Sequence, residues 1–371
     1  MTLLWKPEHL SSPARAGQRS SPLSPADIPE IDASRWFWDF APVVDGNNVA
    51  IAFGDAEIWL ALSAPKGPDA TARHFEARLS VLLLSAAGWR FVGELMPEGA
   101  HPGNREWAGM AVLEGDRLRT YFTSAGVAGH GGRGYQQRLF ESTARMVRDC
   151  DEPAFVDWSV ATEFLAADEG PYLVADQSSG EPGFIRAFRD PFWFNHLNDG
   201  PIVLFTATSS STNSKFNGAI GAGRFEASYQ KWRHIEPLVL SCGVTTELER
   251  PHIVVIDDLF YLFWSTQSYT FASDCPAPTG LYGAVSDRHD GGYRLLNESG
   301  LVLANPKKRP FQAYSWFVTH ELRVQGFVDL PNVPQGRYTG CAPSASERFA
   351  GNAAPQLKLH VDGATTRLIA P

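Results

Sequence analysis

Three segments of the chain place an acidic residue among aromatic or apolar side chains. They read WFWDFAPV at residues 36–43, AFRDPFWF at residues 187–194 and TTELERPHIV at residues 245–254. Burying a carboxylate beside Trp or Phe is costly unless the group is paired or hydrogen-bonded, so such segments form either ion-pair staples or an active site. Arg189 and Arg250 each stand next to a carboxylate and are the obvious pairing partners.

The three segments together favour a catalytic pocket over three separate turns. Taken alone, Arg-Asp-Pro is more often a turn, because Asp hydrogen-bonds its own backbone and Pro fixes the bend. Cleavage of a glycosidic bond needs two carboxyl groups that flank the bond, and their separation decides whether a water molecule or a covalent sugar intervenes. Asp39, Asp190 and Glu249 are candidates for this chemistry if the fold brings them together.

Strands must position these residues. From Trp36 onward the chain consists of short apolar and aromatic runs separated by Gly, Pro, Asp and Asn, and no long stretch has helical spacing. Strand-built units of more than about 40 residues indicate propeller blades with loop insertions. A polar turn followed by a β-rich run recurs at residues 46–54, 115–124, 198–208 and 256–266.

We therefore predict an all-β fold, a five-bladed β-propeller with a central funnel-shaped active site where distant segments meet. A two-sheet sandwich is the alternative. Residues 1–35, rich in Pro, Ser and Ala, are predicted to form an N-terminal lead-in that packs on the body, and residues 36–371 a single catalytic domain. Residues 357–369 predict a late hairpin about Asp362-Gly363 that closes the ring or packs beside it.

The composition argues against several classes of protein. Asp and Glu (41) outnumber Lys and Arg (32) and the formal net charge is -9, which disfavours nucleic acid and suits a neutral or small substrate. No run of about 18 apolar residues is free of charge, so no ordinary transmembrane helix is expected. The first residues show no recognisable secretory signal. The four cysteines, Cys150, Cys242, Cys275 and Cys341, are far apart, which favours buried or free thiols over a disulfide framework.

Six short motifs resemble, in the same order, those of the bacterial levansucrase family, glycoside hydrolase family 68, of the Gram-negative type. The resemblance extends from about residue 36 to residue 330 and includes the neighbouring invertase and inulosucrase groups. It implies a five-bladed propeller with a funnel-shaped pocket. The motifs are Trp38-Asp39 with Pro42, Arg105-Glu106-Trp107-Ala108-Gly109, Phe188-Arg189-Asp190-Pro191, Glu249-Arg250-Pro251-His252, Tyr269-Thr270-Phe271-Ala272 and Pro310-Phe311-Gln312-Ala313-Tyr314-Ser315.

The resemblance implies a role for each candidate carboxylate. Asp39 matches the family nucleophile, Asp190 the residue that stabilises the transition state and holds fructose hydroxyls, and Glu249 the general acid/base. The first and last roles need opposite ionisation states. Asp39 must be ionised to attack the fructose anomeric carbon, whereas Glu249 must hold a proton for the departing glucose, which a dry pocket and neighbouring carboxylates favour.

The resemblance also implies a set of substrate-binding residues. Trp38 and Trp107 match positions where an indole face stacks on a sugar ring and its N–H reaches a hydroxyl, although a Trp is more often core. Glu247, two residues before Glu249, points to the same side if the strand is extended. The predicted binding set is Trp38, Trp107, Ala108, Arg189, Glu247, Gln267 and Tyr314.

Gln267 departs from the family pattern. It stands where similar levansucrases usually carry His, and Gram-positive relatives Arg, a residue that helps to bind the acceptor sugar. A neutral amide does not make the same charge-assisted contacts. Short fructo-oligosaccharides or plain hydrolysis are therefore expected over long-chain levan.

The resemblance predicts a retaining fructosyltransferase that cleaves sucrose, forms a covalent fructosyl-enzyme and passes fructose to water, sucrose or fructan. The alternatives are a mainly hydrolytic β-fructofuranosidase, an inulosucrase and a catalytically silent fructan-binding propeller, which would lack one of the three carboxylates. No cofactor, metal, nucleic acid or membrane is expected, and the predicted state is a monomer. Gram-negative relatives act outside the cytoplasm, so the predicted location is extracellular.

Overall fold

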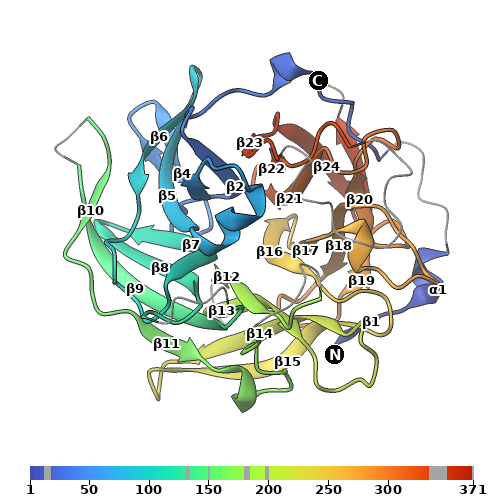
Figure 1. Ribbon diagram of the computed structural model, residues 1–371. Helices are drawn as coiled ribbons and strands as arrows, with labels where there is room; N and C mark the ends of the chain where they lie inside the picture. Colours follow the sequence, from blue (N-terminus) through green and yellow to red (C-terminus); the bar gives the residue numbers. More distant parts are fainter. Residues whose placement is uncertain are drawn as a thin grey trace.

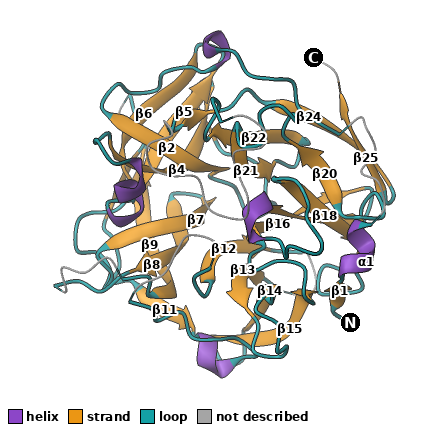
Figure 2. Ribbon diagram, turned by 45° about the vertical axis from the view of Figure 1, so that its right-hand side comes forward, coloured by secondary structure: helices purple, strands orange, loops and turns teal. Residues whose placement is uncertain are grey.

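The protein is an all-β structure in a computed structural model that describes residues 1–11, 18–129, 134–148, 151–178, 184–196, 200–333 and 349–369. Five sheets are arranged around a common axis (Figure 1). The structure confirms the predicted five-bladed β-propeller, and the sandwich alternative is wrong. Helix is scarce as expected (Figure 2): among the described residues α1 (Pro7–Leu10) is the only α-helix, and the other helical pieces are short 3-10 turns.

Each blade consists of four strands in sequence order and one short additional strand. The innermost strands are β2 (Arg35–Pro42), β7 (Arg105–Glu114), β12 (Phe188–Phe194), β16 (Glu249–Ile256) and β21 (Ala313–Val318). The four 3-10 turns are η1 (Pro25–Asp27), η2 (Ala70–Phe75), η3 (Ala167–Glu169) and η4 (Ser268–Thr270). The remaining strands of the first blade are β3 (Ala52–Phe53), β4 (Ala56–Pro65), β5 (Arg78–Ser85) and β6 (Gly88–Glu94), and those of the second are β8 (Arg117–Ala125), β9 (Gln137–Val147), β10 (Ala154–Val156) and β11 (Thr162–Leu165). The third blade adds β13 (Ile202–Thr208), β14 (Gly218–Glu226), β15 (Lys231–Ser241) and β1 (Leu3–Trp5), and the fourth adds β17 (Leu259–Thr266), β18 (Gly280–Ser286), β19 (Arg294–Leu295) and β20 (Leu301–Ala304). The fifth adds β22 (Arg323–Val328), β23 (Asn352–Ala353), β24 (Leu357–Asp362) and β25 (Thr365–Ile369).

The inner strands are buried because neighbouring blades cover both of their faces. Every residue of β12 and of its partner β13 is buried. This packing explains why the strands read as continuous apolar runs rather than as alternating ones.

Three of the four recurring turn-strand units coincide with the second strand of a blade. These strands are β8, β13 and β17, although residues 198 and 199 of the third unit lie outside the described residues. The unit at residues 46–54 is different, because it contains only the short β3, and the second strand of its blade is β4. The chain just before this unit pairs with the next blade, where Val44 N–H donates to the carbonyl of Ala111 at 3.1 Å and Leu113 N–H donates to the carbonyl of Val44 at 2.8 Å.

The N-terminal segment contacts three blades. β1 runs parallel to β15, and Trp5 is fully buried with its ring 5.2–5.8 Å from those of Trp264, Phe271 and Tyr282. Further on, Ser20 N–H donates to the carbonyl of Ala304 in the fourth blade at 3.0 Å. Leu23 N–H donates to the side chain of Gln312, beside the fifth blade, at 3.0 Å. The division into a lead-in and one catalytic domain stays a prediction.

The predicted late hairpin is confirmed. β24 and β25 pair antiparallel, with Asp362 opposite Thr365, and form the outer part of the fifth blade. The first and fifth blades meet where Phe37 N–H donates to the carbonyl of Gly351 at 2.8 Å.

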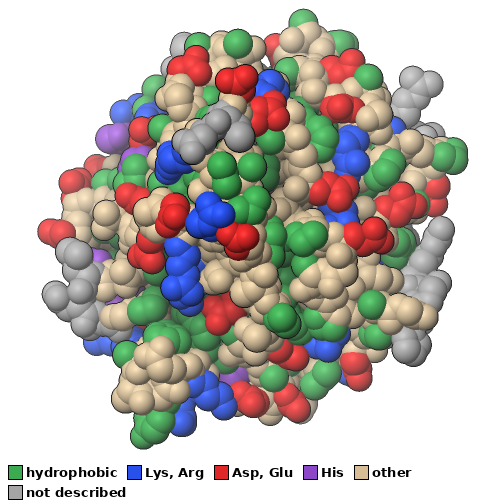
Figure 3. Space-filling view, turned by 90° about the vertical axis from the view of Figure 1, so that its left-hand side faces the viewer, with side chains coloured by type: hydrophobic (Ala, Val, Ile, Leu, Met, Phe, Trp, Pro, Cys, Tyr) green, Lys and Arg blue, Asp and Glu red, His purple; other side chains and the backbone are tan. Residues whose placement is uncertain are grey.

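Two further sequence expectations concern the thiols and the surface. Cys242 and Cys275 are free thiols as predicted, while Cys150 and Cys341 lie outside the described residues. Acidic and basic side chains are interspersed on the face shown in Figure 3, which carries no continuous basic patch. Within the described ranges, no helix is long and apolar enough to cross a membrane.

Candidate active site

The candidate carboxylates lie at β-bulges in three inner strands. The register shifts between Trp38 and Ala41 in β2, between Arg189 and Phe192 in β12, and between Glu249 and His252 in β16. A bulge breaks the strand pairing and re-aims side chains, and it is often found next to active sites.

The backbone at these bulges is unusual. Asp39, Asp190 and Arg250 have φ angles of 58°, 60° and 50°, a region that non-glycine residues seldom adopt. Pro191 and Pro251 lie inside the two bulges of β12 and β16, where a missing N–H breaks no pairing bond. The other inner strands are also bulged, between Trp107 and Gly109 and between Tyr314 and Phe317. The inner strands of all five blades thus carry a β-bulge at corresponding positions.

Arg189 gathers three of the carboxylates. Its Nη2 lies 2.8 Å from Oε1 of Glu247 and 2.8 Å from Oε1 of Glu249, and its Nε lies 3.7 Å from Oδ2 of Asp190. Glu247 lies just before β16 rather than within it, yet it faces Arg189 beside Glu249 as the two-residue spacing predicted. The hydroxyl of Tyr314 donates to Oε2 of Glu249.

Arg250 joins Asp39 to this cluster. Its Nη1 lies 4.0 Å from Oδ1 of Asp39 and donates to the Ser315 hydroxyl at 3.2 Å, and its Nη2 donates to the carbonyl of Phe40 at 3.0 Å. Its backbone N–H donates to Oδ2 of Asp190 at 3.3 Å. The two arginines therefore hold carboxylates from the first, third and fourth blades in one group.

Exposure separates the acids into two kinds. The side chains of Asp39 and Glu249 each keep 18% of their surface open, whereas those of Asp190 and Glu247 keep only 7% and 5%. Asp39 and Glu249 are therefore the two acids that a substrate reaches most easily, and Asp190 and Glu247 lie deeper in the protein.

Burial controls the ionisation of the cluster. Burial raises the pKa of Asp39, and the Arg250 guanidinium and the Ser315 hydroxyl oppose that rise. Burial likewise raises the pKa of Asp190 to about 7, against the effect of Arg189. The pKa of Glu247 is also raised by burial. Such opposed effects on clustered carboxyl groups are typical of catalytic sites.

The two predicted tryptophans lie beside the cluster, and one of them differs from expectation. Trp38 and Trp107 are 3% and 8% exposed. The indole N–H of Trp107 donates to the carbonyl of His74 at 2.8 Å, a bond within the protein that the sequence did not predict. Ala108 is buried in the β7 bulge, and its carbonyl accepts from Thr123, whose Oγ1 in turn accepts from the N–H of Asp190 at 2.9 Å.

Gln267 lies at the end of β17, in the loop that leads into η4. Its Oε1 is buried and has no hydrogen-bond partner among the described residues. The same loop is joined to the segment that carries Glu247, because Thr246 N–H donates to the carbonyl of Thr270 at 3.2 Å. Gln267 is thus on the segment next to the carboxylate cluster.

Two charged residues near the cluster were missed in the sequence. The Arg73 guanidinium lies 3.8 Å from the Phe349 ring and 5.7 Å from that of Trp38. Burial raises the pKa of Asp329 to about 7, with Arg73 opposing and Asp39 and Glu249 adding to the rise. Asp329 follows the run Gly326-Phe327-Val328, so the same pattern of an acid among apolar residues is the sequence signal that identifies it.

The fold and the site together define a propeller enzyme whose carboxylates are clustered around two arginines, an arrangement suited to glycosyl chemistry. A family model described as Levansucrase/Invertase matches residues 9–218 and 203–368. The chain therefore belongs to this family, glycoside hydrolase family 68.

Relatives with known names and structures agree with the assignment. The levansucrase LscB of Pseudomonas savastanoi pv. glycinea is 28% identical over 93% of this chain and 85% of its own length. The levansucrase of Erwinia amylovora is 27% identical over 93% of this chain and 88% of its own length. The structure of an inulosucrase from Halalkalicoccus jeotgali bound to kestose is similar at a TM-score of 0.88 and 30% identity, covering 99% of this chain and 95% of that one.

Proposed function

We propose that the protein cleaves sucrose as a retaining fructosyltransferase. The observation that carries this proposal is the pair of accessible carboxyl groups, Asp39 and Glu249, held by Arg250 and Arg189 in front of the buried Asp190. A retaining mechanism needs one carboxylate as nucleophile and one carboxyl group as acid and then base.

The proposed reaction has two half-reactions. In the first, Glu249 protonates the glycosidic oxygen while Asp39 attacks the fructosyl anomeric carbon, and glucose leaves. In the second, Glu249 takes a proton from water or from a sugar hydroxyl, which attacks the fructosyl-enzyme and frees Asp39. Asp190 binds fructose hydroxyls, and Trp38 offers its ring face to the sugar.

The acceptor in the second half-reaction decides the product. The related inulosucrase and the family description, which includes invertase, support transfer and hydrolysis alike as candidates. We propose short fructo-oligosaccharides and hydrolysis as the main outcomes, because Gln267 offers an uncharged amide where a charged residue would hold an acceptor.

The direct test is to incubate the protein with sucrose and to quantify glucose and free fructose. Glucose release supports the proposal, and glucose in excess of fructose measures transfer. A silent fructan-binding propeller would bind fructo-oligosaccharides without releasing glucose, and that result would overturn the enzymatic role.

Location and assembly are further parts of the proposal. We propose that the protein acts as a monomer outside the cytoplasm, on the basis of its resemblance to Gram-negative relatives. Sucrase activity in cell-free culture medium and a mass near 41 kDa in solution, the 40.7 kDa of one chain, would support this. Activity confined to washed cells, or a dimer mass, would contradict it.

A further inference from the structure

A cavity lies beyond the carboxylate cluster, along the inner strands of the first, third, fourth and fifth blades. It encloses about 280 Å³. Its lining residues follow the cluster by two to five positions, in or just after each strand: Val44 after Asp39, Phe192 after Asp190, Ile253 after Glu249 and Phe317 after Tyr314. At about 3.3 Å per residue, the cavity lies roughly 7 to 17 Å further along these strands than the cluster.

Aromatic side chains separate this distal cavity from the cluster. The rings of His252 and Phe317 stack at 4.4 Å, and Phe192 lies 6.0 Å from His252. His252 is fixed in its neutral form, because its Nδ1 donates to the carbonyl of Arg250 at 2.9 Å and its Nε2 accepts from the N–H of Val318 at 2.9 Å. The buried His252 ring therefore contacts both phenylalanines that line the cavity and is bonded to Arg250 of the cluster.

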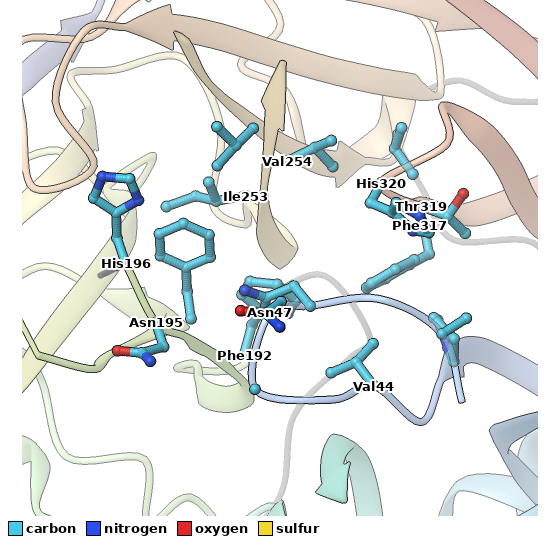
Figure 4. A pocket seen from close by; sticks show the side chains of 17 residues that line it. Val44, Asn47, Phe192, Asn195, His196, Ile253, Val254, Phe317, Thr319 and His320 are labelled. Carbon is cyan, nitrogen blue, oxygen red and sulfur yellow. The ribbon is translucent and has the colours of Figure 1, made fainter. Parts of the chain in front are cut away.

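Among the described residues, the lining of the distal cavity contains two histidines, His196 and His320, and no Asp, Glu, Lys or Arg. Buried Phe192 and Phe317 form its inner part, while Asn47, His196 and His320 at its edge are exposed or half-buried. Figure 4 shows the loop of Val44 and Asn47 facing Ile253 and Val254 across the cavity, with His196 and His320 on opposite sides.

We propose that the distal cavity binds a neutral monosaccharide. Aromatic and aliphatic side chains cover the apolar face of a sugar ring, and amides and imidazoles at the edge bond its hydroxyls. His320 supports this, because it lines the half-buried edge of the cavity, where an imidazole can bond a sugar hydroxyl. The volume lies below the range of about 300 to 1,000 Å³ typical for drug-sized ligands, so it suits one sugar ring rather than an oligosaccharide.

The test uses methyl NMR on the full chain titrated with D-glucose. Ile253 and Val254 line the distal cavity, whereas Ala108 reports on the carboxylate cluster. We expect saturable shifts of the Ile253 and Val254 methyl signals, with a dissociation constant on the order of 1 to 10 mM for so small a ligand. Binding is measured without turnover, so this result and the sucrose assay succeed or fail independently.

A cavity-filling variant identifies the site. Ala50 lines the cavity and Val49 does not, so Ala50→Trp should weaken the Ile253 response at least tenfold while Val49→Trp leaves it intact. Neither substitution should change the Ala108 methyl signal. If Ala50→Trp does not fold, His320→Ala provides the second test, and it should likewise weaken the response of the Ile253 methyl signal to glucose.

Three results would overturn the proposal. The first is an absent Ile253 response up to about 200 mM glucose, well beyond the expected affinity range. The second is an unchanged response in folded Ala50→Trp, which would mean a shift transmitted from the carboxylate cluster. The third is tighter binding of cyclohexanol than of glucose, which would make the cavity a site for apolar molecules.

Discussion

Removing the positive charge of Arg250 should shift the acidic limb of the pH–rate profile to higher pH. Burial raises the pKa of Asp39, and the Arg250 guanidinium, whose Nη1 is 4.0 Å from Oδ1 of Asp39, is the main group that opposes this rise. The proposed nucleophile must be ionised to attack. In Arg250→Met, Asp39 therefore keeps its proton to a higher pH, and the acidic limb of the pH–rate profile moves upward.

The size of the effect follows from Coulomb's law. Two unit charges 4 Å apart interact by about 4 kcal/mol at an effective dielectric constant of about 20. Asp39 keeps 18% of its side chain exposed, so we halve this to about 2 kcal/mol for solvent screening. Since 1.36 kcal/mol corresponds to one pKa unit, the acidic limb should rise by about 1.5 pH units.

The assay is kcat/KM for glucose release from sucrose across pH 4 to 8, in which the acidic limb reports the free enzyme. Arg250→Lys is the matched control, because it keeps the charge while losing the two-pronged contact with Phe40 and Ser315. It should lower the rate but hold the acidic limb near its native position. An unmoved limb in folded Arg250→Met would refute the electrostatic reasoning, and thermal melting verifies the fold of both variants.

Three further changes test other parts of the site. Asp39→Asn should lower the turnover of sucrose by about 10³-fold or more with an unchanged melting temperature, since no other nucleophile replaces it; near-normal rates would remove that role. Gln267→His should raise the ratio of transfer to hydrolysis about fivefold through a charge-assisted acceptor contact, and an unchanged product spectrum would place the residue outside the acceptor site. Glu106→Gln should cost about 3 kcal/mol of unfolding free energy, because the buried carboxylate accepts from Arg78 at 2.8 Å and lies 2.8 Å from Nε2 of His101; a denaturant midpoint equal to that of the native chain would contradict this.

The sequence predicted the parts of the site that carry local signals. Asp39, Asp190 and Glu249 stand within aromatic or motif-bearing segments, and Arg189 is adjacent to one of them, so each was recognisable from its neighbours in the chain. The all-β class followed for the same reason, since strand patterns are local. The resemblance then supplied roles that residue chemistry alone left open.

Contacts between blades leave no local pattern in the sequence. Arg73 from the first blade meets Phe349 near the fifth, and Thr123 of the second blade accepts from the backbone of Asp190 in the third. These pairs are separated by between 67 and 276 residues, and neither member carries a pattern that points to the other. Propeller closure makes such contacts, so they appear only when the blades are placed around the axis.

The bulges show most clearly what the site requires of the fold. A φ near +55° normally selects Gly, yet Asp39, Asp190, Arg250 and Ser315 adopt it at corresponding positions of four inner strands. Each such residue costs about 1 to 3 kcal/mol of strain, which persists only where the surrounding structure enforces it. A glycine at any of these positions would relieve the strain but remove a carboxylate, the cation that opposes the pKa rise of Asp39, or the hydroxyl that Arg250 bonds. The fold therefore maintains the strain because the chemistry needs those side chains at those places.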